Sequence, residues 1–112
     1  MLAMFLAMLE SEEDQRRFTK LYEAYEKKVY AVALRILGDP VRAEDAAQQT
    51  WFQLLKRWDR VSALPWEETE GYAVTTSKNC ALDMLRAERR TMAFPEDWDP
   101  PAPEDRQDEY DY

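Results

Sequence analysis

The sequence contains no histidine and only two glycines among its 112 residues. Histidine is the commonest general base and a frequent metal ligand, so a familiar catalytic triad or a metal centre cannot be assembled from this chain. The two glycines, Gly38 and Gly71, are too few and too far apart to form a Gly-rich phosphate-binding loop. We therefore expect no enzymatic activity, no bound metal and no cofactor.

Cysteine is nearly absent as well, and no apolar run is long enough to cross a membrane. Cys80 has no second cysteine with which to form a disulfide bond, which is typical of a reducing compartment. The apolar stretch at residues 1–9 is too short to span a bilayer and lacks the charged start of a signal peptide. We expect a cytoplasmic protein with no membrane partner. Residues 1–9 are expected to dock on the domain as a short helix, with a partner-binding stripe as the alternative.

Negative charge is concentrated at one end of the chain. Acidic residues exceed basic ones by 23 to 15, and eight of the acids fall within residues 95–112 beside a single arginine. The same stretch holds four prolines and no valine, isoleucine or leucine, which predicts an acidic linker or disordered tail. We expect residues 1–94, which are nearly neutral, to form a single domain. A nucleic-acid partner is compatible with this composition, because binding depends on the charge of the contacting face.

Two long helices are predicted in the first half of the chain. Ser11 has the character of an N-cap, and apolar residues spaced by three and four continue from there to Leu37. The segment Gly38-Asp39-Pro40 supplies a left-handed stop, a cap and a proline suited to a first helical turn. A second helix should therefore run back from Pro40 to about Arg60 and form a hairpin with the first.

Residues 61–70 break this helical periodicity, and Pro65 keeps either neighbouring helix from running through them. A third helix is predicted from Gly71 to Thr91. The expected fold class is all-α, a compact bundle of three main helices plus a short N-terminal helix. Trp66 stands in the predicted loop, where its ring could stack on an unpaired base or cover the end of the bundle.

The third helix has one polar and one apolar side. At about 100° per residue, six side chains fall within a strip about 80° wide. They are Tyr72, Thr76, Asn79, Asp83, Arg86 and Arg90. Such a row of hydrogen-bonding groups could contact one extended partner. Spacing alone favours the simpler alternative, a solvated face on which Asp83 and Arg86 pair at i, i+3.

The second helix also presents two different sides. Apolar residues that include Trp51 and Trp58 fall on one side and are suited to a core. The other side gathers polar residues around one aromatic ring, and its members are Asp45, Gln48, Gln49, Phe52 and Lys56. An aromatic ring among polar groups indicates an interface. The alternative is that Phe52 simply reaches the first long helix.

Two motifs in this order and at this separation resemble region 2 of bacterial σ70-family transcription initiation factors. The first is GDP-x-x-AEDA-x-Q at residues 38–48, and the second is N-x-x-x-D-x-x-R at residues 79–86. The resemblance covers residues 14–91 and is greatest to the extracytoplasmic-function (ECF) group. It implies the helical fold described above and a role in transcription initiation.

The resemblance also implies which residues contact which partner. The residues that match the segment gripping the clamp helices of the β′ subunit of core RNA polymerase are Asp45, Gln48, Gln49, Trp51 and Phe52. Asn79, Asp83 and Arg86 match the helix that, with the preceding loop, melts the minus-ten element of the promoter and holds its non-template strand. Together with the loop tryptophan, the rest of the polar strip and the neighbouring basic residue, the residues expected to bind promoter DNA are Trp66, Tyr72, Thr76, Asn79, Asp83, Arg86, Arg89 and Arg90. An anti-sigma factor is a further partner of such proteins.

Two positions depart from the family pattern. The family usually has an acidic residue where Gln49 stands and a basic one where Thr75 stands. One charge-assisted contact to polymerase and one phosphate contact are therefore missing. The missing basic residue at Thr75 and the nearly neutral body favour the alternative function, a helical adaptor or region-2-only regulator that binds polymerase or another protein without reading DNA.

Overall fold

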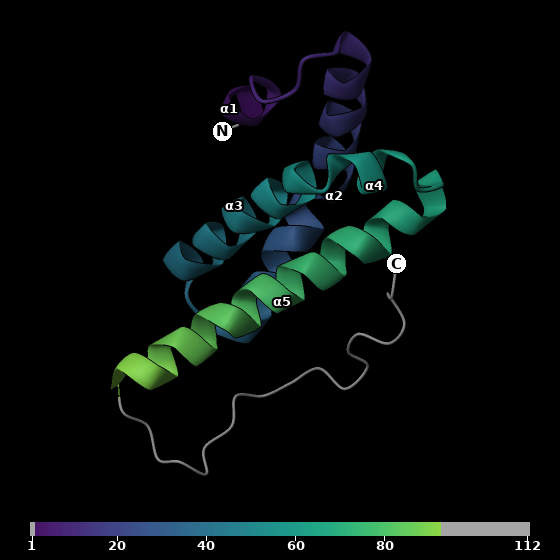
Figure 1. Cartoon of the computed structure of the whole chain (residues 1–112). Helices are drawn as coiled ribbons and strands as arrows, with labels where there is room; N and C mark the ends of the chain where they lie inside the picture. Colours follow the sequence, from purple (N-terminus) through teal and green to yellow (C-terminus); the bar gives the residue numbers. More distant parts are fainter. Residues whose placement is uncertain (1, 93–112) are drawn as a thin grey trace.

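The computed structural model describes the backbone of residues 2–92 and the side chains of residues 2–89, and this part folds entirely into helices and short connections (Figure 1). The helices are α1 (Leu2–Leu6), α2 (Glu12–Leu37), α3 (Pro40–Lys56), α4 (Trp58–Ser62) and α5 (Trp66–Met92). The all-α prediction is confirmed, with α2, α3 and α5 as the three main helices and α1 as the short N-terminal one. The acidic tail predicted for residues 95–112, and with it the domain boundary, lies outside the described residues.

The predicted helix ends at residues 11 and 38–40 are confirmed. Ser11 caps α2, because its Oγ accepts a hydrogen bond from the backbone N–H of Asp14 at 3.0 Å. Gly38 ends α2 in the left-handed conformation, with a φ of 71°, and its N–H donates to the Leu34 carbonyl at 2.7 Å. Asp39 then caps α3, and Pro40 occupies its first turn. The hairpin between α2 and α3 is therefore specified locally.

The other predicted boundaries need correction. The second helix ends at Lys56 rather than near Arg60, because Arg57 leaves helical geometry with a φ of −112° and a ψ of 32°, and the short α4 follows. The third helix begins at Trp66 rather than Gly71. Pro65 stands immediately before the first turn of α5, where its carbonyl accepts from Glu68 N–H at 2.9 Å. A proline at a helix start loses no backbone hydrogen bond, so it initiates α5 instead of breaking it.

The core has an aromatic part and a part built from small residues. Phe18 lies at the centre of the aromatic part, where its ring contacts Phe5, Trp51 and Trp58 with centroid distances of 5.7 to 5.9 Å. The complete burial of Phe5 confirms that α1 docks on the domain. The second part lies between the end of α2, the start of α3 and the middle of α5, and its buried members are Ala33, Leu37, Ala43, Ala46, Cys80 and Ala81. Small side chains there let the three helices approach closely.

Polar contacts fix α5 against α2 along its length. The Tyr25 hydroxyl and the Thr69 hydroxyl share a buried hydrogen bond at 3.1 Å near the start of α5. Further along, the Ser77 hydroxyl donates to the backbone carbonyl of Val29 at 2.8 Å. Figure 1 shows α5 crossing the α2–α3 hairpin as one long, unbroken rod. None of the helices within residues 2–92 is both long and apolar enough to traverse a bilayer.

Candidate functional site

The outward side of α3 brings together four of the five residues predicted to contact polymerase. Asp45 and Gln49 are exposed, Gln48 is half-buried, and Phe52 keeps 41% of its surface exposed. With two further α3 residues they line an open hollow of about 570 Å³, whose complete lining is Asp45, Gln48, Gln49, Phe52, Gln53 and Lys56. One exposed ring surrounded by amides and charges is an arrangement typical of a protein-binding surface. We call this set of six residues the α3 surface.

Trp51, the fifth predicted contact residue, faces the interior. Its side chain is only 2% exposed, and its ring packs on Tyr22 with centroids 4.9 Å apart. Neighbouring residues in a helix point about 100° apart, so Trp51 and the exposed Phe52 cannot share one face. We therefore correct Trp51 from a direct contact to a core residue that supports α3 from beneath.

Phe52 has an aromatic neighbour that the sequence did not indicate. Its ring meets that of Phe5, on α1, edge-on at a centroid distance of 6.0 Å and an interplanar angle of 66°. The ring is thus substantially exposed and also contacts α1, and its role in an interface stays a prediction. Aromatic contacts across such sequence distances leave no periodic signal, so sequence reasoning could not find Phe5.

On α5, three predicted DNA-binding residues lie exposed on one side, namely Asn79, Asp83 and Arg86. Arg86 Nη1 and Asp83 Oδ1 are 3.2 Å apart, so the predicted i, i+3 pair is formed. Thr76 is half-buried, and its hydroxyl donates to the Tyr72 carbonyl of the same helix at 2.8 Å. We call Thr76, Asn79, Asp83 and Arg86 the α5 strip.

The last two predicted DNA-binding residues, Arg89 and Arg90, stand near the end of α5. Arg89 is half-buried and takes part in a contact of its own, and the Arg90 side chain lies outside the described residues.

Tyr72 was predicted to belong to the polar strip, and this placement is wrong. The side chain is only 7% exposed and belongs to the aromatic core. Near its start α5 buries Thr69, Tyr72 and Ala73, whereas further along it buries Ser77, Cys80 and Ala81. The buried side therefore rotates along the helix as α5 crosses its neighbours, and Tyr72 falls on the buried side.

Trp66 packs within the domain at the start of α5. Its ring stacks on that of Tyr25, with centroids 5.6 Å apart and an interplanar angle of 23°, and Lys20 Nζ lies 4.5 Å from the ring centroid. Of the two roles considered for Trp66, the structure shows the packing role. Stacking on an unpaired base stays a prediction.

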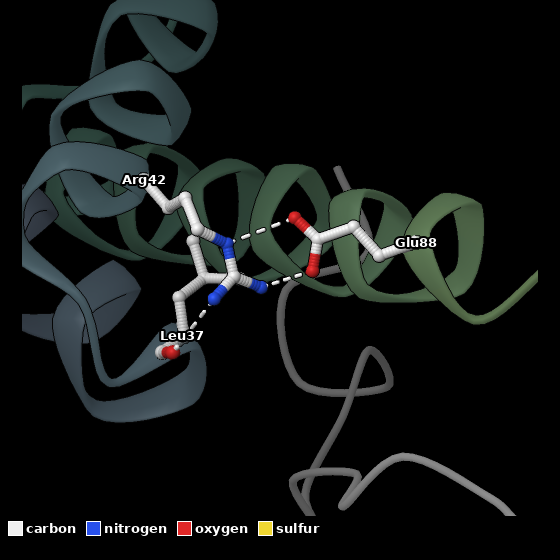
Figure 2. Close-up of polar contacts among 3 residues, drawn as sticks. All are labelled: Leu37, Arg42 and Glu88. Atoms are coloured by element: carbon white, nitrogen blue, oxygen red, sulfur yellow. Dashed lines mark hydrogen bonds and ion pairs between the residues drawn. The ribbon is translucent and has the colours of Figure 1, made fainter. Parts of the chain in front are cut away.

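An ion pair between helices sets the charge at the far half of α5 (Figure 2). Arg42 on α3 holds the Glu88 carboxylate at two points, with its Nε 2.8 Å from Oε2 and its Nη2 on Oε1. Arg42 also reaches the Leu37 carbonyl at 3.5 Å, at the end of α2. Sequence reasoning missed this pair, since its members are 46 residues apart.

Burial affects the pKa values of two titratable groups in the core. Burial raises the pKa of the Cys80 thiol above its ordinary value, so it stays protonated near neutral pH and is a poor nucleophile. Burial also raises the pKa of Tyr22, helped by the nearby carboxylate of Glu26. In the described part of the chain, no group of three or more potential ligand residues could hold a metal ion.

Comparison with known families identifies the class. The family model described as Sigma-70 region 2 matches residues 21–91, which include both the α3 surface and the α5 strip. The chain belongs to the sigma-70 region 2 family. Searches of curated proteins and of solved structures gave no match. Membership in this family implies a role in transcription initiation, with core RNA polymerase and promoter DNA as partners. The family is a domain of non-enzymatic transcription factors.

Proposed function

We propose that this chain is an ECF-type sigma region 2 that binds the β′ clamp helices of core RNA polymerase through the α3 surface and melts and reads the minus-ten element through α5. The observation that supports this best is the clustering of Asp45, Gln48, Gln49 and Phe52 around one open hollow. Helical spacing and the family resemblance both indicated these four positions, and all four lie within the family match.

The chemistry of the α3 surface suits a helical protein partner. The exposed Phe52 ring offers an apolar anchor, and buried aromatic anchors carry much of the binding energy in protein interfaces. Gln48 and Gln49 each present a donor and an acceptor at its rim. Asp45 adds a negative charge that suits a basic side chain of the partner.

The chemistry of the α5 strip suits a single strand of DNA. Asn79 offers a hydrogen-bond donor and an acceptor to a base edge, and Asp83 accepts from an exocyclic amine or orients Asn79. Arg86 provides attraction to phosphate, and the exposed position of its pair with Asp83 makes that pair easy to open. Along α5, the groups suited to reading bases therefore precede the arginine that attracts phosphate.

A helical adaptor that binds protein without reading DNA is the second candidate. It is favoured by the burial of Tyr72 and by the packing of Trp66 on Tyr25, because stacking on a base would need a free ring. Both candidates use the α3 surface to bind a protein, which for the adaptor is polymerase or another protein. DNA binding through the α5 strip separates them.

The α3 surface can be tested by titrating purified bacterial core RNA polymerase with the full chain and its Phe52→Ala variant. We expect the variant to keep its helical content and to bind about 1 to 3 kcal/mol more weakly, because the anchor is lost from an exposed position. The matched control is Val41→Ala, which removes an exposed apolar side chain from the same helix outside the α3 surface. Equal affinity of wild type and Phe52→Ala would rule out this surface as the polymerase contact.

A further inference from the structure

The short helix α1 precedes the family match, which begins at residue 21, yet it is firmly built into the domain. The Phe5 side chain is fully buried and meets the Phe18 ring edge-on, with centroids 5.9 Å apart. Gln15 donates from Nε2 to the carbonyl oxygens of Leu6 and Leu9, at 3.2 and 2.8 Å. Leu6 is the last residue of α1 and Leu9 lies in the connection that follows, so Gln15 ties the end of α1 and this connection to α2. Both a side chain and the backbone therefore hold α1 in place.

Through α1 the aromatic core extends to the α3 surface. The Phe5 ring contacts the buried Phe18 ring and the partly exposed Phe52 ring, both in edge-on geometry. Phe52 itself points away from the core, as its exposed fraction of 41% shows. The adjacent Trp51 packs directly on Phe18 without help from α1. Phe5 thus connects the rigid core to a ring that would otherwise project from α3.

A rigid neighbour lowers the entropy that an exposed aromatic ring loses when a partner binds it. A free aromatic side chain loses rotamer freedom when a partner immobilises it, and a ring that is already restrained loses less. Edge-on aromatic contacts at these distances are favourable and orient both rings. Phe5 is completely buried and held in place with α1, so it can restrain Phe52 without moving itself.

We propose that Phe5 is a positioning residue for the polymerase contact: it orients the Phe52 ring on the α3 surface, so that α1 is part of the binding site although it lies outside the family match. This inference rests on the proposed function of the α3 surface. Its partner is the same helical segment of polymerase, and Phe5 acts on it only through Phe52.

A double-mutant cycle tests this, with purified core RNA polymerase as the probe and the full chain in four forms: wild type, Phe5→Leu, Phe52→Leu and the double variant. Circular dichroism fixes a temperature at which all four are fully folded. We expect Phe5→Leu to weaken binding about three- to tenfold, the worth of one aromatic contact. In the Phe52→Leu background the same change should have little further effect, because the ring that Phe5 orients is gone. Met4→Leu, on the exposed side of α1, is the matched control and should bind as wild type does.

Gln15→Leu is a second test of the positioning role, and it leaves the Phe5 side chain in place. It removes the hydrogen bonds to Leu6 and Leu9 and loosens α1, so it should weaken binding in the same direction, and it decides the matter if Phe5→Leu does not fold. Additive effects of Phe5→Leu and Phe52→Leu, or wild-type binding by Phe5→Leu, would overturn the positioning role alone. Tighter binding by Phe5→Leu would mean that α1 masks the surface and would overturn it too. Wild-type binding by Phe52→Leu would contradict the proposed role of the α3 surface in binding polymerase, and the role of Phe5 would fall with it.

Discussion

Arg42 and Glu88 join the first turn of α3 to the far half of α5 through a two-point ion pair (Figure 2). Their side chains are 32% and 35% exposed, so solvent screens the pair only in part. A guanidinium group that meets a carboxylate at two points fixes direction as well as distance. The pair therefore sets where the basic end of α5 lies relative to the α2–α3 turn.

Removing this pair should destabilise the domain measurably. We expect Arg42→Ala to lower the free energy of unfolding by about 1 kcal/mol, because a two-point, half-buried pair exceeds the usual surface pair. Urea titration followed by circular dichroism gives the value. The control is Arg16→Ala, whose pair with Glu12 is 4.0 Å long and highly exposed and should contribute nothing measurable. Similar losses in the two variants would contradict the structural role given to Arg42.

Base reading and phosphate attraction on the α5 strip should separate by mutation. The probe is a single-stranded oligonucleotide selected from a random pool by the complex of the full chain with core polymerase, compared with a scrambled one. We expect Asn79→Ala to weaken binding of the selected strand by about 1 to 3 kcal/mol and to weaken binding of the scrambled strand much less. Arg86→Ala should weaken binding of both strands equally. It should also reduce the slope of log affinity against log salt concentration by about 0.7. If Asn79→Ala affects the two strands equally, the adaptor function is favoured.

Cys80 should make stability fall in mildly alkaline solution. Burial raises its pKa above the ordinary 9.0, outweighing the lowering effect of the nearby Thr50 hydroxyl. As the pH rises above 9, the unfolded chain releases the thiol proton while the folded protein retains it, so the free energy of unfolding decreases. Below pH 9 both states hold the proton and this contribution is constant.

The measurement is a series of urea titrations between pH 7 and 10 on wild type and Cys80→Ala. The variant should show a smaller decrease between pH 9 and 10, and its absolute stability is not used because the substitution also leaves a small cavity. Identical slopes for the two proteins would show that Cys80 does not titrate differently on folding.

The parts of the fold that were predicted correctly are those determined by residues close in sequence. Ser11 and Gly38 act through their own backbone conformation and nearest hydrogen bonds, so their types suffice to place two helix ends. The wrong boundary at Pro65 has the opposite cause. A proline can end one helix or begin the next, and packing of Trp66 on Tyr25 stabilises the second outcome.

The candidate site was predictable only where a helix face stays constant. Residues of the α3 surface recur at helical spacing on a single helix, and four of the five predicted contacts lie there. Tyr72 was misplaced because the buried side of α5 rotates where the helix crosses its neighbours, and a straight helical projection cannot include that rotation. Phe5 and Glu88 act across 46 or more residues, and only the tertiary structure brings them to their partners.

The hydrogen bond from Ser77 to the Val29 carbonyl fixes the position of α5 along α2. Sliding one helix past the other by a single residue, about 1.5 Å, would strand a buried hydroxyl without its acceptor. Since α3 is joined to α2 by the short turn at Gly38, the distance between the α3 surface and the α5 strip is fixed within the fold. Under the proposed function, a strand bound on α5 would therefore be held at a set distance from the polymerase.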